Sequence, residues 1–248
     1  MAGEICRFWL IVTGKGEEVF LPSLFRGLMA RAHCHFKVIG RIGQRRPITS
    51  QERLVTMVRK GQRLPRIDAE EIGLPIRAYL RKYPGSYAMI VDDLEGSRRA
   101  IAEPVYARYR SSLDEILGPA GSQSRASAHF LVNMLEAYYF ADSRAVNRAA
   151  GFSVLEDDHP TDVEDIGHPK GELKKRWQAF DEKAHGGAIV GVLDLEHVLS
   201  RPAECCWLRA MFAWCVAKLS EADAIWDATL KESFGLPNGC KSPITSGQ

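Results

Sequence analysis

Four acidic residues of this chain follow apolar runs typical of buried strands, and carboxylates in such places can hold a metal ion. Glu17 follows the first apolar run, and Asp92, Asp93 and Glu95 follow the run Tyr87 to Val91. In a parallel sheet, ligands bind beyond the carboxyl ends of the strands, so these acids would meet if the two strands are neighbours. Crowded carboxylates repel one another, and a hard cation relieves that repulsion through oxygen ligands. The pattern favours Mg²⁺, with Mn²⁺ as a substitute, at Glu17, Asp92, Asp93 and Glu95, although the same acids could instead cap helices.

Strand-like and helix-like patterns alternate along the first part of the chain. Apolar, β-rich runs lie at 5–13, 35–42, 87–91 and 127–132, and helical spacing lies at about 17–28, 51–60, 75–82, 98–117 and 133–150. This alternation predicts an α/β fold, a parallel sheet of about four strands flanked by helices. The later part predicts helices at 169–180, 187–199, 205–219 and 221–234. We therefore expect an α/β core at 1–150, a mainly helical extension at 151–236 packed on it, and a loose tail at 237–248.

The charge of the chain is unevenly distributed, although its net value is only +2. The segment from Arg26 to Arg110 holds 18 Lys and Arg against 8 Asp and Glu, and the remainder holds 15 against 23. A basic half of this kind favours a polyanionic partner such as nucleic acid, and the alternative is a set of solvated helix faces. The candidates for contact with a nucleic-acid backbone are Arg41, Arg45, Arg46, Arg53 and Arg59.

Two further residues are candidates for the same site. Glu136 follows the fourth predicted strand closely, whereas Asp142 lies six residues later and would face elsewhere on a regular helix. Lys170, in His168-Pro169-Lys170, is as compatible with a first helical turn as with a phosphate ligand. The aromatic group that begins at Tyr138 is more typical of a core than of a base-stacking platform.

Several segments in this order resemble the domain-of-unknown-function 4276 family. They are Gly14 to Leu21, Ile90 to Glu95, Asn133 to Asp142, His168 to Lys170 and Asp194 to Leu199. The resemblance covers nearly the whole chain and implies a TOPRIM-like fold, related to nuclease domains of the overcoming-lysogenization-defect type.

The resemblance also implies roles for individual residues. Glu17 would take the place of the TOPRIM glutamate, which handles acid–base chemistry, and Asp92, Asp93 and Glu95 are candidates for the Mg²⁺-binding Asp-x-Asp. The strict motif is absent, because Asp93-x-Glu95 has its spacing while Asp92 stands at the strand end. Glu17, Asp92 and Asp93 are accordingly the catalytic candidates.

Two functions follow as expectations. The first is a Mg²⁺-dependent nuclease or phosphoryl-transfer protein acting on nucleic acid, in a setting of bacterial phage defence. The second is a non-catalytic TOPRIM-like subunit beside an ATPase partner in a defence assembly. No run reaches the length of a membrane span, and the first apolar run lacks the pattern of a signal peptide, so we expect a cytoplasmic protein without a membrane partner. Six cysteines without a C-x-x-C pair are expected to be reduced thiols.

Overall fold

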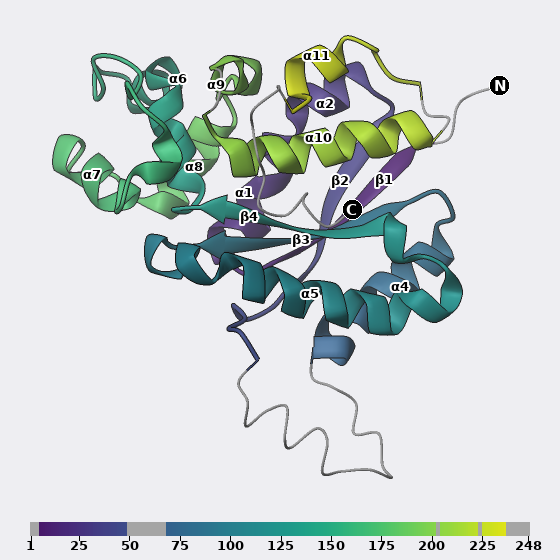
Figure 1. Ribbon diagram of the computed structural model, residues 1–248. Helices are drawn as coiled ribbons and strands as arrows, with labels where there is room; N and C mark the ends of the chain where they lie inside the picture. The colour runs from purple at the N-terminus through teal and green to yellow at the C-terminus, as the bar shows by residue number, and fades with distance from the viewer. Residues whose placement is uncertain (1–4, 49–67, 202–203, 223–224, 237–248) are drawn as a thin grey trace.

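Four strands pair in parallel into one sheet within the described part of the chain, which comprises residues 5–48, 68–201, 204–222 and 225–236 of this computed structural model. The strands are β1 (Cys6–Val12), β2 (Cys34–Arg41), β3 (Tyr87–Leu94) and β4 (Ala126–Val132). Their order across the sheet is β2-β1-β3-β4, so β1 and β3 are central neighbours. The predicted α/β class, with a parallel sheet flanked by helices and a helical C-terminal region, is confirmed, and the arrangement is consistent with a TOPRIM-like fold (Figure 1).

Helices cover both faces of the sheet, because successive side chains of a buried strand point to opposite sides. One face carries Phe8, Leu10 and Val12 of β1 in a core shared with the helical C-terminal region. The other carries Trp9 and Ile11 in a core shared with α5. Figure 1 shows α10 on the first side of the sheet and α5 on the second. The helices nearest the sheet are α1 (Lys15–Leu24), α2 (Arg26–Arg31), α4 (Leu74–Lys82), α5 (Ala102–Leu117) and α10 (Cys206–Glu221).

Two expected helices of the α/β part are broken in the structure. The segment 98–117 forms a 3₁₀ helix, η2 (Gly96–Ile101), and then α5, whose first turn accommodates Pro104 because no intrahelical N–H is needed there. The segment 133–150 forms a second 3₁₀ helix, η5 (Leu135–Ala141), and then α6 (Ser143–Ala150). Asp142 separates them, since its Oδ1 accepts from the backbone N–H of Ala145 at 3.2 Å and starts a new helix. The helix expected around 51–60 lies outside the described residues.

The C-terminal region is helical, but its described helices other than α10 are shorter than their sequence patterns predict. The range 187–199 is divided between two helices because Asp194 caps the second with a 3.1 Å hydrogen bond from His197 N. The helix expected at 221–234 is limited, in its described part, to five residues. The elements are α7 (Pro169–Arg176), α8 (Glu182–Val190), α9 (Leu195–Ser200), α10 and α11 (Leu230–Phe234).

Two further sequence expectations can be compared with the structure. Among the described residues, no helix has the length and apolar character needed to cross a membrane. Cys6, Cys34, Cys205 and Cys215 are buried free thiols, as expected. Cys206 is disulfide-bonded, so the expectation of reduced thiols throughout is wrong at that residue.

A stack of phenylalanine rings joins the sheet to the helices on its first face. Phe36 of β2 lies between Phe8 and Phe25, with ring centroids 4.5 Å and 4.0 Å away and planes within 5° and 2° of parallel. Phe25 in turn stacks on Phe212 of α10 at 5.0 Å. The stack therefore connects β1, β2, the α1–α2 junction and α10 in one contact series.

We expect Phe36→Ala to lower the free energy of unfolding by about 3–5 kcal/mol, because the change removes a buried ring between two others and leaves a cavity. Phe152→Ala is the matched control, since Phe152 is 51% exposed and should cost less than about 1 kcal/mol. Denaturant unfolding followed by circular dichroism measures both. Equal losses in the two variants would show that the stack does not connect sheet and helices as described.

Candidate active site

The loop after β1 and the end of β3 lie side by side at one edge of the sheet. Val12 pairs with Val91 in the register of the two strands. Thr13 then joins the strand ends: its hydroxyl donates to Asp92 Oδ1 at 2.9 Å and accepts from the backbone N–H of Asp93, also at 2.9 Å. The two acid-bearing segments of the sequence thus meet because their strands are neighbours.

Asp92 is fully buried, and its carboxylate is surrounded by hydrogen-bond donors. Oδ1 accepts from Thr13 and from Arg98 Nη1 at 3.2 Å, and Oδ2 accepts from Arg98 Nη2 and from the Tyr109 hydroxyl, each at 2.9 Å. Arg98 therefore neutralises the charge of Asp92 within the protein. The sequence-derived metal and catalytic role of Asp92 stays a prediction, and the structure places this carboxylate in a network separate from the other acids of the site.

Asp93, the next residue, belongs to a cluster of carboxyl groups. Among the described residues, its carboxylate has no ion-pair partner comparable to Arg98. Its Oδ1 is buried and has no hydrogen-bond partner among the described residues. Burial, followed by the negative charges of Glu17 and Glu136, raises the pKa of Asp93 to about 8. Adjacent residues of a strand point to opposite sides, so Asp92 and Asp93 have different surroundings although they are neighbours in sequence.

Glu17 and Glu136 complete this group, which we call the carboxyl cluster (Glu17, Asp93 and Glu136). Both glutamates are 4% exposed. Burial and the charges of Glu136 and Glu182 raise the pKa of Glu17 to about 7. Burial also raises the pKa of Glu136. The cluster therefore holds protons near neutral pH, because charging all of its members in a buried place is unfavourable.

Two glycines leave the space that the glutamates occupy. A Cβ built at Gly14 would lie 1.6 Å from Oε2 of Glu17, and one at Gly16 would lie 2.6 Å from Oε1 of Glu182. The Gly14-x-Gly16 segment thus allows carboxylates to fold against the loop after β1. In this structure the lack of a side chain at these glycines makes room for Glu17 and Glu182.

A turn with a strained backbone, directly after β4, positions Glu136 in the carboxyl cluster. Asn133 and Met134, directly after β4, both have positive φ, at 57° and 70°. With ψ at 168°, Met134 occupies a region of backbone space that is essentially restricted to glycine. The sequence gives no sign of this turn, because neither residue is a glycine. Such strain persists only where the surrounding structure holds it, and it is found most often at functional sites.

Lys170 supplies the positive charge nearest to the cluster. Its Nζ lies 3.4 Å from Glu136 Oε1 and also pairs with Glu182, whose side chain is 34% exposed. Burial acts to lower the pKa of Lys170, but the Glu182 and Glu136 carboxylates outweigh it and raise that pKa. Sequence reasoning named Lys170 and missed Glu182, because no motif or spacing links α8 to the strand ends.

Carboxyl oxygens are the donors that Mg²⁺ prefers, and the buried, unpartnered Oδ1 of Asp93 is a free ligand position. Among the described residues, however, no three His, Cys, Asp or Glu side chains are close enough to form a metal site. The carboxylates are therefore near enough to raise one another's pKa but are not arranged around one metal position. Carboxylate oxygens suit Mg²⁺, and Glu17, Asp93 and Glu136 are the residues that would hold it.

The remaining predicted residues lie around this edge or outside the described part of the chain. Glu95 is exposed and contributes to the raised pKa of Asp93. Arg41 pairs with Glu18 at 2.8 Å, and Arg45 pairs with Asp68 at 2.7 Å and with Glu71. Arg46 is exposed. Arg53 and Arg59 lie outside the described residues.

No protein family model matches the chain, and no curated protein or solved structure matches it either. The resemblance noted above therefore stays a prediction.

The cluster predicts a stability that falls as pH rises. Folding moves the pKa of Asp93 from 3.8 to about 8 and that of Glu17 from 4.5 to about 7. Between these values the folded state holds protons that the unfolded chain has released, so each carboxyl lowers stability by up to about 1.4 kcal/mol per pH unit. Asp93→Asn should therefore be more stable than wild type at pH 8 and no more stable at pH 4, by denaturant unfolding.

The adjacent residue gives the control for this prediction. Asp92→Asn removes the charge partner of Arg98, whose side chain is 13% exposed, and should destabilise the protein at both pH values. A loss of stability in Asp93→Asn like that in Asp92→Asn would show that Asp93 is a compensated structural acid.

Gly14→Ala should keep the fold and displace the Glu17 carboxylate, because Gly14 has a φ of −98° that alanine accepts while its Cβ would overlap Glu17. Displacing that charge should lower the pKa of Asp93 toward its usual value, measured by carboxyl-carbon NMR. Gly43→Ala is the matched control, since its nearest side-chain atom would be 3.7 Å away. An unchanged Asp93 pKa in Gly14→Ala would show that Glu17 does not act on Asp93.

Proposed function

We propose that this protein is a Mg²⁺-dependent phosphoryl-transfer enzyme, a nuclease acting on nucleic acid. The observation that carries the proposal is the buried Oδ1 of Asp93, which has no hydrogen-bond partner among the described residues and lies at a parallel strand end; the charges of Glu17 and Glu136 help to raise the pKa of this carboxyl. Raised carboxyl pKa values from burial and like charge are typical of catalytic and metal-binding sites. Phage defence belongs to the same proposal and rests on the resemblance noted above, and the cytoplasmic location rests on the sequence.

The residues of the chain would divide the chemistry among them. Glu17, with a pKa of about 7, can take up or release a proton at neutral pH and is suited to act as a general base toward water. Asp93 and Glu136 would supply carboxylate oxygens for Mg²⁺. When bound, Mg²⁺ neutralises phosphate charge and lowers the pKa of bound water. Lys170, which pairs with Glu136, would contact a substrate phosphate.

A second candidate is the non-catalytic subunit beside an ATPase. It is favoured by the contacts of Lys170, whose ammonium group already pairs with Glu136 and Glu182 and so supplies a cation to the site. A chain in which lysine permanently offsets these acids would need no metal. The two candidates differ in whether Lys170 or a divalent cation balances the cluster.

Melting with and without Mn²⁺ distinguishes the candidates. If the cluster binds metal, saturating Mn²⁺ should raise the melting temperature of wild type, since a ligand at 100 times its Kd stabilises by about 2.7 kcal/mol. Asp93→Asn and Glu17→Gln should gain much less, and metal-dependent cleavage of single- and double-stranded DNA and RNA should fall with them. The control is Glu156→Gln, an exposed acid, which should respond as wild type does.

The contrary results are equally specific. Mn²⁺ binding that is identical in wild type and in both variants would place the metal elsewhere. An absence of any Mn²⁺ effect, with no cleavage, would favour the non-catalytic subunit.

A further inference from the structure

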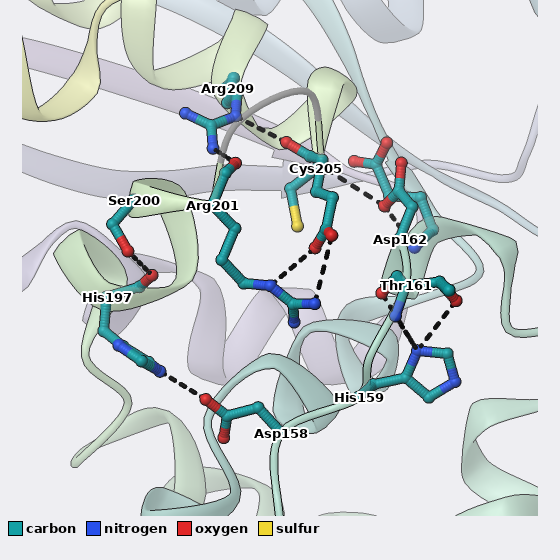
Figure 2. Close-up of polar contacts among 11 residues, drawn as sticks. Asp158, His159, Thr161, Asp162, His197, Ser200, Arg201, Cys205 and Arg209 are labelled. Atoms are coloured by element: carbon teal, nitrogen blue, oxygen red, sulfur yellow. Dashed lines mark hydrogen bonds and ion pairs between the residues drawn. The ribbon is translucent and has the colours of Figure 1, made fainter.

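A groove of about 730 Å³ lies among α9, α10 and α11 and shares no residue with the carboxyl cluster. Its lining includes Arg144, His197, Arg209 and Lys231 on the basic side. Figure 2 shows part of this region, with His197 and Ser200 on one side and Arg209 above Arg201. The groove is of the size that small-molecule sites have.

Arg209, in the first turn of α10, is a buried cation that forms no ion pair with a described residue. The residue is 3% exposed, and its guanidinium donates to two backbone carbonyls, from Nε to Glu204 O at 2.6 Å and from Nη2 to Arg201 O. Nη1 makes no hydrogen bond to a described residue and points away from Arg201 in Figure 2. The charges of Glu164, Glu204 and Asp162 act on Arg209, but none of these carboxylates forms an ion pair with it among the described residues. A buried charge that is left unpaired is costly, so a charged ligand would relieve it.

The carboxylate of Glu164 is occupied at the start of α10. The Oε1 of Glu164 accepts from the backbone N–H groups of Trp207 and Leu208, both at 3.2 Å, and from the Tyr138 hydroxyl at 3.0 Å. An internal acid thus satisfies the helix N-terminus. The charge of Arg209 is what remains for a ligand.

The acids that line the groove are largely engaged as well. Asp194 caps α9 through His197 N, and Glu196 pairs with Arg31 of α2. His197 lies 2.6 Å from Asp158. Glu232, on the exposed first turn of α11, is the acid for which the described contacts show no partner.

The other two cations of the groove, Lys231 and Arg144, make few ion pairs and hydrogen bonds with described residues. Lys231 contacts the face of Trp226 at 5.2 Å and forms no ion pair with a described residue. Arg144 is 67% exposed at its side chain and approaches Asp142 at 3.6 Å, an acid already occupied in capping α6. Three cations from α6, α10 and α11 therefore line one groove.

We propose that this groove binds a small molecule through its phosphate group, with Arg209 as the buried anchor. A guanidinium matches the oxygens of phosphate in a two-point contact, and such charge-assisted hydrogen bonds are among the strong ones. Lys231 and Arg144 add charge at the rim, and Glu232 sets a limit on how far the negative charge of the ligand extends toward α11. The site is independent of the carboxyl cluster and does not need a divalent cation.

The test uses inorganic phosphate as the probe on the full chain, without divalent cations. The melting temperature of wild type should rise with phosphate in a saturable way, measured against sodium chloride and sodium acetate at equal ionic strength. Arg209→Gln should raise the apparent Kd for phosphate about tenfold or more, because it removes a charged donor from a buried site. Lys231→Gln should raise it by about threefold, in keeping with an exposed charge.

Lys231→Gln also protects the test against failure of the buried variant to fold, since Lys231 is exposed. Its matched control is Lys175→Gln, which changes a lysine with a 72% exposed side chain on α7 and should bind phosphate as wild type does. A rise that does not saturate, one that acetate reproduces, or one that is the same in Lys231→Gln as in wild type would each overturn the proposal.

Discussion

The burial of negative charge at the carboxyl edge of the sheet is the constraint on which the site depends. Removing an ionised carboxyl from water costs several kcal/mol unless a partner compensates it. Asp92 has that partner in Arg98, with Thr13 and Tyr109 completing its hydrogen bonds. Asp93 has none for its Oδ1 among the described residues, and its raised pKa is the result. One aspartate of the pair thus secures the strand end, and the other has a carboxyl group with a raised pKa.

Several features of the surrounding structure keep these acids buried although their burial is unfavourable. Glycines at 14 and 16 leave room for Glu17 and Glu182, and the turn at Asn133 and Met134 brings in Glu136 at the expense of backbone strain. The Lys170 ammonium offsets part of the charge from outside the cluster. The sheet can tolerate this unfavourable burial of acids, because hydrophobic cores on both of its faces stabilise the strands.

The groove beside Arg209 shows the opposite imbalance in another part of the molecule. There the acids are engaged in helix caps and ion pairs, and a buried guanidinium forms no ion pair with a described residue. Buried acids thus gather at the sheet edge, and cations gather along the groove. The two regions share no residue, so a ligand at one does not require a ligand at the other.

The sequence by itself predicted the parallel sheet and put Glu17 and the acids of β3 at strand ends, because apolar runs and strand-end acids are local patterns. Only the tertiary structure made β1 and β3 neighbours and so brought these acids to one edge. The sequence could not decide which aspartate joins the cluster, since alternation puts Asp92 and Asp93 on opposite sides without saying which side holds Arg98 and Tyr109. Glu182 also escaped notice, and the expected single helix at 133–150 was wrong because Asp142 ends one helix and starts the next. The choice of aspartate and the place of Glu182 depend on contacts between segments far apart in the chain, and only the packing of α5, α7 and α8 around the strand ends settles them.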